Sequence, residues 1–336
     1  MRRLGLSFLA VLSVAAAAHA QLLPPVPALK DTVAQVPPPV FRSGAELVAL
    51  SVAVLDRNQH FVRGLAATDF AVFEDGVQQD VSFFATSDVP LDLILLLDTS
   101  ASMSDKMKSV HEAALGFLRT LRGQDRGAVV AFNDGVQVLQ ALTGDFPSLE
   151  RAVRSTQPSG ATALNNAIYV ALKEFGRSAR QSGEVRRQAI AVLSDGDDTC
   201  SLISFDDVLG EAKKSGVGIY TISLRMRLGP RQHGTFSTAL YSMKTLAQET
   251  GALAFFPAAI EDLSGVYGKI ADELEHQYAI GYSPKNGRAD GRFRRVIVQV
   301  VSRPELRLRA RTGYFAERAR GSTAAANTAS APLPRR

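Results

Sequence analysis

The sequence predicts an α/β protein with a doubly wound, mostly parallel sheet covered by helices on both faces, joined to a small β-rich module. From residue 91 onward, short apolar runs alternate with stretches of helical periodicity, the pattern of a parallel sheet buried on both faces. Shorter strand-like segments precede and follow that region, with turn residues such as Asp75-Gly76 between them. The 336 residues also exceed what one average domain requires.

The first residues are organised like a secretory signal peptide. Two arginines precede an apolar run at 4–18, which ends in the small-residue triplet Ala18-His19-Ala20. The run is shorter than the roughly 20 residues of a membrane-spanning helix. We therefore expect cleavage after Ala20 and a secreted or periplasmic protein.

Composition and periodicity divide the remainder of the chain. The expected segments are a signal peptide at 1–20, a Pro-rich linker at 21–44, a β-rich flank at 45–88, the α/β domain at 89–276, a second β-rich flank at 277–316 and a disordered tail at 317–336. In the α/β domain we expect strands at 91–98, 128–132, 189–194, 218–224 and 253–256, and helices at 104–121, 164–175, 205–214, 240–249 and 260–275. In the flanks we expect strands at 46–55, 70–74, 81–85, 278–282, 294–301 and 306–311. Because the flanks enclose the α/β domain in the sequence, we expect them to pair with each other as one sheet.

Charge, cysteine content and glycine spacing argue against several functions. The formal net charge is +5, but the basic residues are scattered and no aromatic-interleaved basic face is visible, so we expect no nucleic-acid binding. Cys200 is the single cysteine, which excludes an intramolecular disulfide, and no histidine near it in sequence would activate the thiol. No Gly-x-Gly-x-x-Gly follows the first expected strand, so dinucleotide binding is unsupported.

Oxygen-bearing side chains follow the first strand of the α/β domain. Asp98 ends that strand, and Ser100 and Ser102 come two and four residues later. Ligands of open α/β sheets bind at such strand ends, and carboxylate and hydroxyl oxygens suit a hard cation such as Mg²⁺. Taken alone, Ser102 or Ser104 would more often cap a helix.

Two later segments carry similar groups. Thr162 follows Gly160 in a loop that opens an expected helix, and Asp195 ends a second apolar strand. Each has a local interpretation, Thr162 as a helix cap and Asp195 as a turn former. All three patterns in this order, each where the sheet would bring them together, favour a shared site.

The order Asp-x-Ser-x-Ser, then Thr, then Asp resembles the metal-ion-dependent adhesion site of the von Willebrand factor type A domain. The apolar strand before Asp98 and Met103 after the serines agree with that family. Segments 69–76, 278–282 and 312–314 resemble its exported bacterial relatives, so the resemblance covers roughly residues 45–315. One departure is Asn165-Asn166, where relatives often carry Tyr-Asp.

The resemblance implies a role for each matching residue. Ser100 and Ser102 would contact Mg²⁺ or Mn²⁺ directly, Asp98 and Asp195 directly or through water, and Thr162 directly in the ligand-bound state. The remaining coordination position would accept an Asp or Glu carboxylate from a protein partner. The expected function is therefore non-enzymatic capture of a partner, with association with the cell envelope compatible with export.

Other interpretations stay open at this point. The chain could be a structural envelope scaffold whose cation only stabilises loops. A Mg²⁺-dependent phosphatase of the haloacid dehalogenase type is disfavoured, because its second acid would stand where Ser100 lies. Asp197-Asp198 could form a second cation site, but a solvated acidic loop is favoured. Nothing in the sequence indicates an oligomeric state.

Overall fold

The structure is a computed structural model that describes residues 47–86, 89–182, 186–195, 197–224 and 238–318. All of these belong to one unit, residues 44–336. The expected signal peptide and Pro-rich linker lie outside the described residues, as does the expected tail from residue 319 onward. Within the described ranges, no helix combines the length and apolarity needed to cross a membrane.

A six-stranded sheet forms the centre of the α/β domain, in the order β10-β9-β8-β5-β6-β7. Its strands are β5 (Leu91–Asp98), β6 (Arg126–Phe132), β7 (Val136–Thr143), β8 (Arg187–Ser194), β9 (Gly218–Ser223) and β10 (Ala254–Phe255). Every neighbouring pair is parallel except β6 and β7. Because β6 and β8 flank β5 on opposite sides, the sheet order reverses there, and ligands of such sheets bind at the C-terminal strand ends beside this point.

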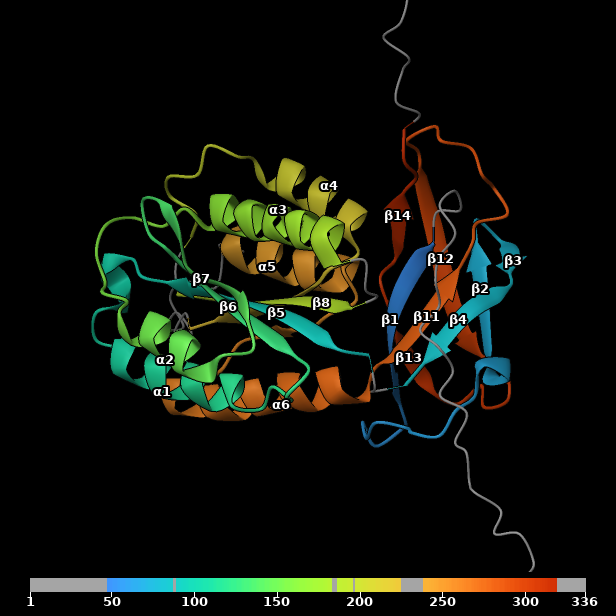
Figure 1. Ribbon diagram of the computed structural model, residues 1–336, viewed down its shortest axis with the longest axis horizontal. Coiled ribbons are helices and arrows are strands. Elements are labelled where there is room, and N and C mark those ends of the chain that lie inside the picture. Colours follow the sequence, from blue (N-terminus) through green and yellow to red (C-terminus); the bar gives the residue numbers. More distant parts are fainter. Residues whose placement is uncertain (1–46, 87–88, 183–185, 196, 225–237, 319–336) are drawn as a thin grey trace, which may run out of the picture. The chain divides into compact units, whose positions relative to one another are not determined.

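Helices cover both faces of that sheet (Figure 1). They are α1 (Met107–Leu118), α2 (Phe146–Arg154), α3 (Leu164–Ser182), α4 (Phe205–Ser215), α5 (Thr238–Glu249) and α6 (Leu263–His276). Successive side chains of β5 point to opposite faces. Leu93 and its alternate neighbours pack with α1, α2 and α6, whereas Ile94 and Leu96 pack with α3, α4 and α5. The uninterrupted apolar run of β5 is thus explained by burial on both sides.

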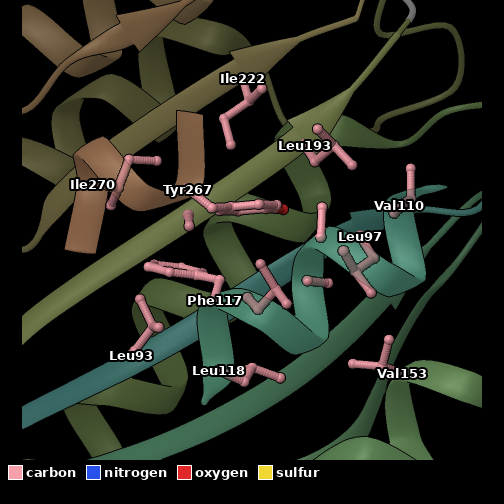
Figure 2. Close-up of a cluster of buried hydrophobic side chains, with 14 of the residues drawn as sticks. Leu93, Leu97, Val110, Phe117, Leu118, Val153, Leu193, Ile222, Tyr267 and Ile270 are labelled. Carbon is pink, nitrogen blue, oxygen red and sulfur yellow. The ribbon is translucent and has the colours of Figure 1, made fainter. Parts of the chain in front are cut away.

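Figure 2 shows the first of these two cores. Leu93 and Leu97 of β5 face the aromatic pair Phe117 and Tyr267, which stack with ring centroids 4.7 Å apart. Phe117 comes from α1 and Tyr267 from α6, so this contact joins two helices that are far apart in the sequence. Because Phe117 lies in the last turn of α1, this contact packs the C-terminal end of α1 against α6.

The main differences from the expectation in the α/β domain concern five elements. Helix α1 begins at Met107 rather than Ser104, because residues 101–103 form a separate 3₁₀ turn. Helix α3 extends to Ser182, and β10 has only two residues. Strand β7 and helix α2 were not expected. β7 is an edge strand without a buried residue, and α2 is a short helix of nine residues that buries only three.

The flanking segments form two four-stranded sheets, β13-β1-β11-β4 and β14-β12-β2-β3. Their strands are β1 (Val48–Leu55), β2 (Phe70–Glu74), β3 (Val77–Gln79), β4 (Val81–Ala85), β11 (Tyr278–Tyr282), β12 (Phe293–Val300), β13 (Arg307–Arg309) and β14 (Gly313–Phe315). Each sheet combines strands from both flanks, and the two share one hydrophobic core. The flanks therefore pair as expected, but the expectation of a single sheet was wrong.

The turn at Asp75-Gly76 is tighter than expected. Asp75 has a φ of 47° and Gly76 a φ of 82°, so both adopt the left-handed conformation of a two-residue hairpin turn. The turn joins β2 to the short β3, with Glu74 paired to Val77. Three residues are too few to show an alternation of apolar and polar side chains, so the sequence did not predict β3.

Candidate metal site

Asp98 lies at the buried C-terminal end of β5. Its side chain is fully buried, and each carboxylate oxygen accepts a hydrogen bond, Oδ1 from the backbone N–H of Ser100 (2.8 Å) and Oδ2 from the Ser194 hydroxyl (2.6 Å). Burial raises the pKa of the Asp98 carboxyl, and the hydrogen bonds from Ser194 and Ser100 offset that rise only in part. Because Ser194 is the last residue of β8, this hydrogen bond joins the C-terminal ends of β5 and β8, where the sheet order reverses.

Hydrogen bonds link the two serines of the motif to the second acid. The Ser100 and Ser102 hydroxyl oxygens lie 3.1 Å apart, and the Ser102 hydroxyl donates to Asp195 Oδ1 at 2.7 Å. Ser100 is buried, whereas Ser102 is exposed. Four of the five expected ligands, Asp98, Ser100, Ser102 and Asp195, thus form one continuous hydrogen-bonded group.

Thr162 lies on the adjacent loop. The backbone N–H of Ser159 donates to the Thr99 carbonyl (2.7 Å) and that of Ala101 donates to the Gly160 carbonyl (3.0 Å), so this loop and the Asp-x-Ser-x-Ser loop run side by side. Thr162 itself is buried, and its backbone N–H donates to the Thr199 hydroxyl. Within the described residues, no hydrogen bond joins the Thr162 hydroxyl to the other four expected ligands.

Gly160 makes this loop arrangement possible. Its φ is +75°, and a Cβ built on it would lie 2.2 Å from Oδ1 of Asp134. The same Asp134 oxygen accepts a hydrogen bond from the backbone N–H of Ala161. Only glycine fits both the conformation and the space.

The local interpretation of Ser102 or Ser104 as a helix cap does not hold. Helix α1 begins at Met107 with Lys106 at its N-cap position and no side-chain cap, and the Ser104 hydroxyl donates to the Ala101 carbonyl. Neither Ser102 nor Ser104 therefore caps this helix. Within the described residues, the side chain of Asp195 bonds to residues 93 and 89 positions away in the sequence.

Lys106 belongs to the site, although the sequence analysis did not include it. Its Nζ lies 2.5 Å from Asp195 Oδ2 and donates to the Ser102 carbonyl at 2.7 Å. The spacing of four residues from Ser102 is the only signal that could have suggested this contact. Ser194, the donor to Asp98, was also missed.

The acidic pair Asp197-Asp198, expected as a solvated loop, is partly buried and accepts hydrogen bonds from backbone donors. Asp198 accepts hydrogen bonds from the backbone N–H groups of Asn165 (2.7 Å) and Ser201 (2.9 Å), and Asp197 accepts from Ala239 (3.3 Å). Asn165 and Ala239 lie in the first turns of α3 and α5. The two carboxylates thus satisfy free donors at helix N-termini.

Asn166 also has a structural role. Its side-chain oxygen accepts hydrogen bonds from the backbone N–H groups of Leu202 (3.2 Å) and Ile203 (3.1 Å). An acceptor is needed here, and asparagine supplies it without adding negative charge.

The donor set fits a small divalent cation. Two carboxylates and three hydroxyls offer only oxygen, which is the preference of Mg²⁺ and Mn²⁺. The part of the chain that the structure describes contains no cluster of three or more His, Cys, Asp or Glu suited to a metal. A site composed mainly of hydroxyl oxygens differs from such a cluster, and soft ions that require thiolate or imidazole would find no suitable ligands in it.

Part of the chain matches a known family of protein domains. The family model described as von Willebrand factor type A domain matches residues 93–197. The inter-alpha-trypsin inhibitor heavy chain H2 of Mus musculus is 28% identical over 147 residues, which are 40% of this chain and 15% of that protein. A Synechocystis protein is 30% identical over 114 residues, 32% of this chain and 26% of the relative. The solved structure of a von Willebrand factor type A protein from Catenulispora acidiphila is 12% identical with a TM-score of 0.47, covering 84% of this chain and 76% of that one. The chain thus spans a minor part of these curated relatives.

Proposed function

Because the chain contains a von Willebrand factor type A domain, we propose that it is an exported, non-enzymatic binding protein that captures a partner protein through a divalent cation. The cation is Mg²⁺ or Mn²⁺. Its ligands are Asp98, Ser100, Ser102, Thr162 and Asp195. The partner supplies an Asp or Glu carboxylate, and nucleic acid is not a ligand.

The hydrogen-bonded group of Asp98, Ser100, Ser102 and Asp195 is the observation that carries this proposal. These residues come from loops after β5 and β8, yet they meet at the end of the sheet where ligands of such folds bind. The Thr162 loop is bonded to the same turn. Such an arrangement would bring oxygen ligands to one cation with little rearrangement.

The mechanism follows from the kind of ligand that each residue offers. When bound, the cation supplies an electrophilic centre for a carboxylate. Ser100 and Ser102 would hold it with neutral hydroxyls, while Asp98, whose oxygens also accept two hydrogen bonds, and Asp195 would be the charged members of the set. An Asp or Glu carboxylate from the partner would then add a favourable ionic contact.

The surroundings of Asp98 favour binding over phosphoryl transfer. A nucleophilic aspartate needs a free oxygen lone pair that is directed at the substrate. Here the side chain has no exposed surface, so a substrate phosphorus could not reach either oxygen unless the side chain moved. Ser100, moreover, occupies the position where the phosphatase mechanism requires an acid.

The proposed setting of this activity is outside the cytoplasm. A signal peptide at 1–20 and a Pro-rich linker at 21–44 would deliver the α/β domain (89–276) and its β-rich flanks (45–88 and 277–316) to the periplasm or beyond, with 317–336 as a disordered tail. Attachment to envelope components through the bound partner is part of the proposal.

The experiment compares metal binding and partner capture in two variants. Asp98→Ala removes the acid at the centre of the hydrogen-bonded group, and we expect it to lose Mg²⁺ binding in titration calorimetry and chelator-sensitive capture from envelope and culture supernatant. Asp80→Ala is the matched control, since it removes a carboxylate whose side chain is 88% exposed in the flank. Unchanged capture by Asp98→Ala would refute the proposal. Metal that stabilises the protein without any chelator-sensitive capture would support the scaffold alternative, and hydrolysis of a generic phosphate ester would support the enzyme.

A further inference from the structure

We infer that Lys106 is a built-in cation that weakens metal binding at this site and leaves the bound metal more attractive to an anionic partner. The inference rests on the proposed function. It concerns the contact between the Lys106 ammonium and the Asp195 carboxylate, which neither the motif nor the local sequence requires.

Several hydrogen bonds hold Lys106 and Asp195 in contact. Lys106 Nζ lies 2.5 Å from Asp195 Oδ2 and donates to the Ser102 carbonyl oxygen at 2.7 Å. The other oxygen of Asp195 accepts the Ser102 hydroxyl. Both oxygens of this acid therefore have partners from the loop before α1. The ammonium is fixed between Asp195 and the backbone of Ser102, a ligand residue of the proposed site.

Burial makes the pair stronger than an ordinary surface ion pair. The side chain of Asp195 is 7% exposed and that of Lys106 is 26% exposed. Charges that are shielded from water interact more strongly, because the effective dielectric constant is lower. Asp105 also lies near Lys106, at 3.7 Å, but its side chain is 84% exposed and competes weakly.

The charge balance gives the functional consequence. Asp98 and Asp195 provide two formal negative charges, and Lys106 cancels one of them. An approaching divalent cation then meets one net negative charge instead of two, so it binds more weakly. Once bound, it leaves the site with one net positive charge rather than none. Lys106 thus lowers the affinity of the site for the metal and strengthens the attraction between the metal-loaded site and a carboxylate.

The test uses the full chain with three single variants. Lys106→Gln removes the charge but keeps a polar side chain, and Lys106→Arg keeps the charge. Lys108→Gln is the matched control, because Lys108 is exposed two residues further along α1 and its loss changes the net charge equally. Mn²⁺ binding is followed by electron paramagnetic resonance of the free ion, and Mg²⁺ binding by calorimetry.

We expect Lys106→Gln to bind Mn²⁺ at least about fivefold more tightly than the wild type, because a fixed positive charge close to the ion is removed. Lys106→Arg and Lys108→Gln should stay within about twofold, since one retains the charge and the other removes a distant, solvent-screened one. In the presence of chelator, Lys106→Gln should also melt at a lower temperature than the wild type. Addition of Mn²⁺ should then raise the melting temperature of Lys106→Gln more than that of the wild type.

The outcomes separate this inference from the proposed function. If the wild type binds Mn²⁺ and Lys106→Gln binds it equally or more weakly, Lys106 serves to position Asp195. The inference about Lys106 is then wrong, while the proposed metal site stands. If neither the wild type nor the folded Lys106→Gln variant binds Mn²⁺, the proposed metal site itself is wrong. Folding of each variant is checked by circular dichroism.

Discussion

Asp125 shows how one buried carboxylate can organise the start of the central strand. Its Oδ1 accepts the backbone N–H of Leu91 (2.8 Å), the first residue of β5, and its Oδ2 accepts the backbone N–H of Arg122 (2.9 Å). Burial alone would raise the pKa of this carboxyl, but the hydrogen bonds from Arg122 and Leu91 outweigh it and lower the pKa below the usual 3.8. The ionised form is therefore the one that stabilises the fold.

We expect Asp125→Asn to lower the free energy of unfolding by about 1.5–3 kcal/mol at pH 7, the usual range for hydrogen bonds to a charged group. A carboxyl whose pKa is lower in the folded state contributes stability above its unfolded pKa and loses it as the pH falls through the folded value. The difference from the wild type should therefore shrink below about pH 4. Urea unfolding at pH 7 and pH 3 measures it, and an equal difference at both pH values would contradict this explanation.

Individual residues of the candidate site were predictable only in part. The spacing of Asp98, Ser100 and Ser102, with Thr162 and Asp195 later, indicated which loops should meet, because parallel strands end at the same edge of the sheet. The structure links four of the five by hydrogen bonds, and their role as metal ligands stays a prediction. Lys106 and Ser194 carried no motif, since their partners lie 89 and 96 residues away.

At the scale of elements, the loop from Asp198 to Ile203 depends on α3. Asp198 accepts from Asn165, while Asn166 accepts from the backbone of Leu202 and Ile203, so the two segments satisfy each other's free donors. The loop borders Thr162, whose carbonyl accepts the backbone N–H of Thr199. Its order should therefore follow the side chain at position 166.

Asn166→Ala tests this dependence. We expect it to cost about 1 kcal/mol in unfolding free energy, since two exposed backbone donors would turn to water, and to accelerate amide exchange at Leu202 and Ile203. Asn166→Asp is the matched control, because it keeps an acceptor oxygen at the same place. Equal exchange rates in wild type and Asn166→Ala would show that the loop is held by other contacts.

The elements that were predicted well are those whose pattern is local. The bounds of β2, β4, β5 and β11 agree with the expectation, because each is a distinct run of apolar or β-branched residues between polar or turn residues. Strand β14 was missed even though Gly313-Tyr314 was noted as part of a resemblance. It is three residues long, and its pairing with β12 is what makes it a strand.

At the scale of the molecule, both flank sheets need both ends of the described chain. Strand β11 lies between β1 and β4, and β12 lies between β14 and β2. The shared core likewise combines residues from both flanks, such as Val52 with Ile280. In contrast, the two cores of the α/β domain draw all their buried residues from between Leu91 and Leu274.

Deletion of residues 277–316 should therefore unfold the N-terminal flank while the α/β domain stays folded. Amides of β1 are expected to lose nearly all exchange protection, because their partners in β11 and β13 are gone. Amides of β5 should remain protected in the same sample. Deletion of residues 319–336 is the control. Persistent protection of β1 in the first deletion would show that the N-terminal flank can fold without its partner strands.

The fold class, the central strand and the order of the oxygen-bearing residues follow from the amino-acid sequence, because apolar periodicity and strand ends are local features that neighbouring residues specify. The division of the flanks into two sheets, the hydrogen bonds of Asp197 and Asp198 to helix donors, and the contact of Lys106 with Asp195 are seen in the folded molecule alone. Those outcomes depend on which segments meet after folding. Side chains that are distant in sequence can pair with a particular donor, acceptor or charge only after packing has brought them within reach.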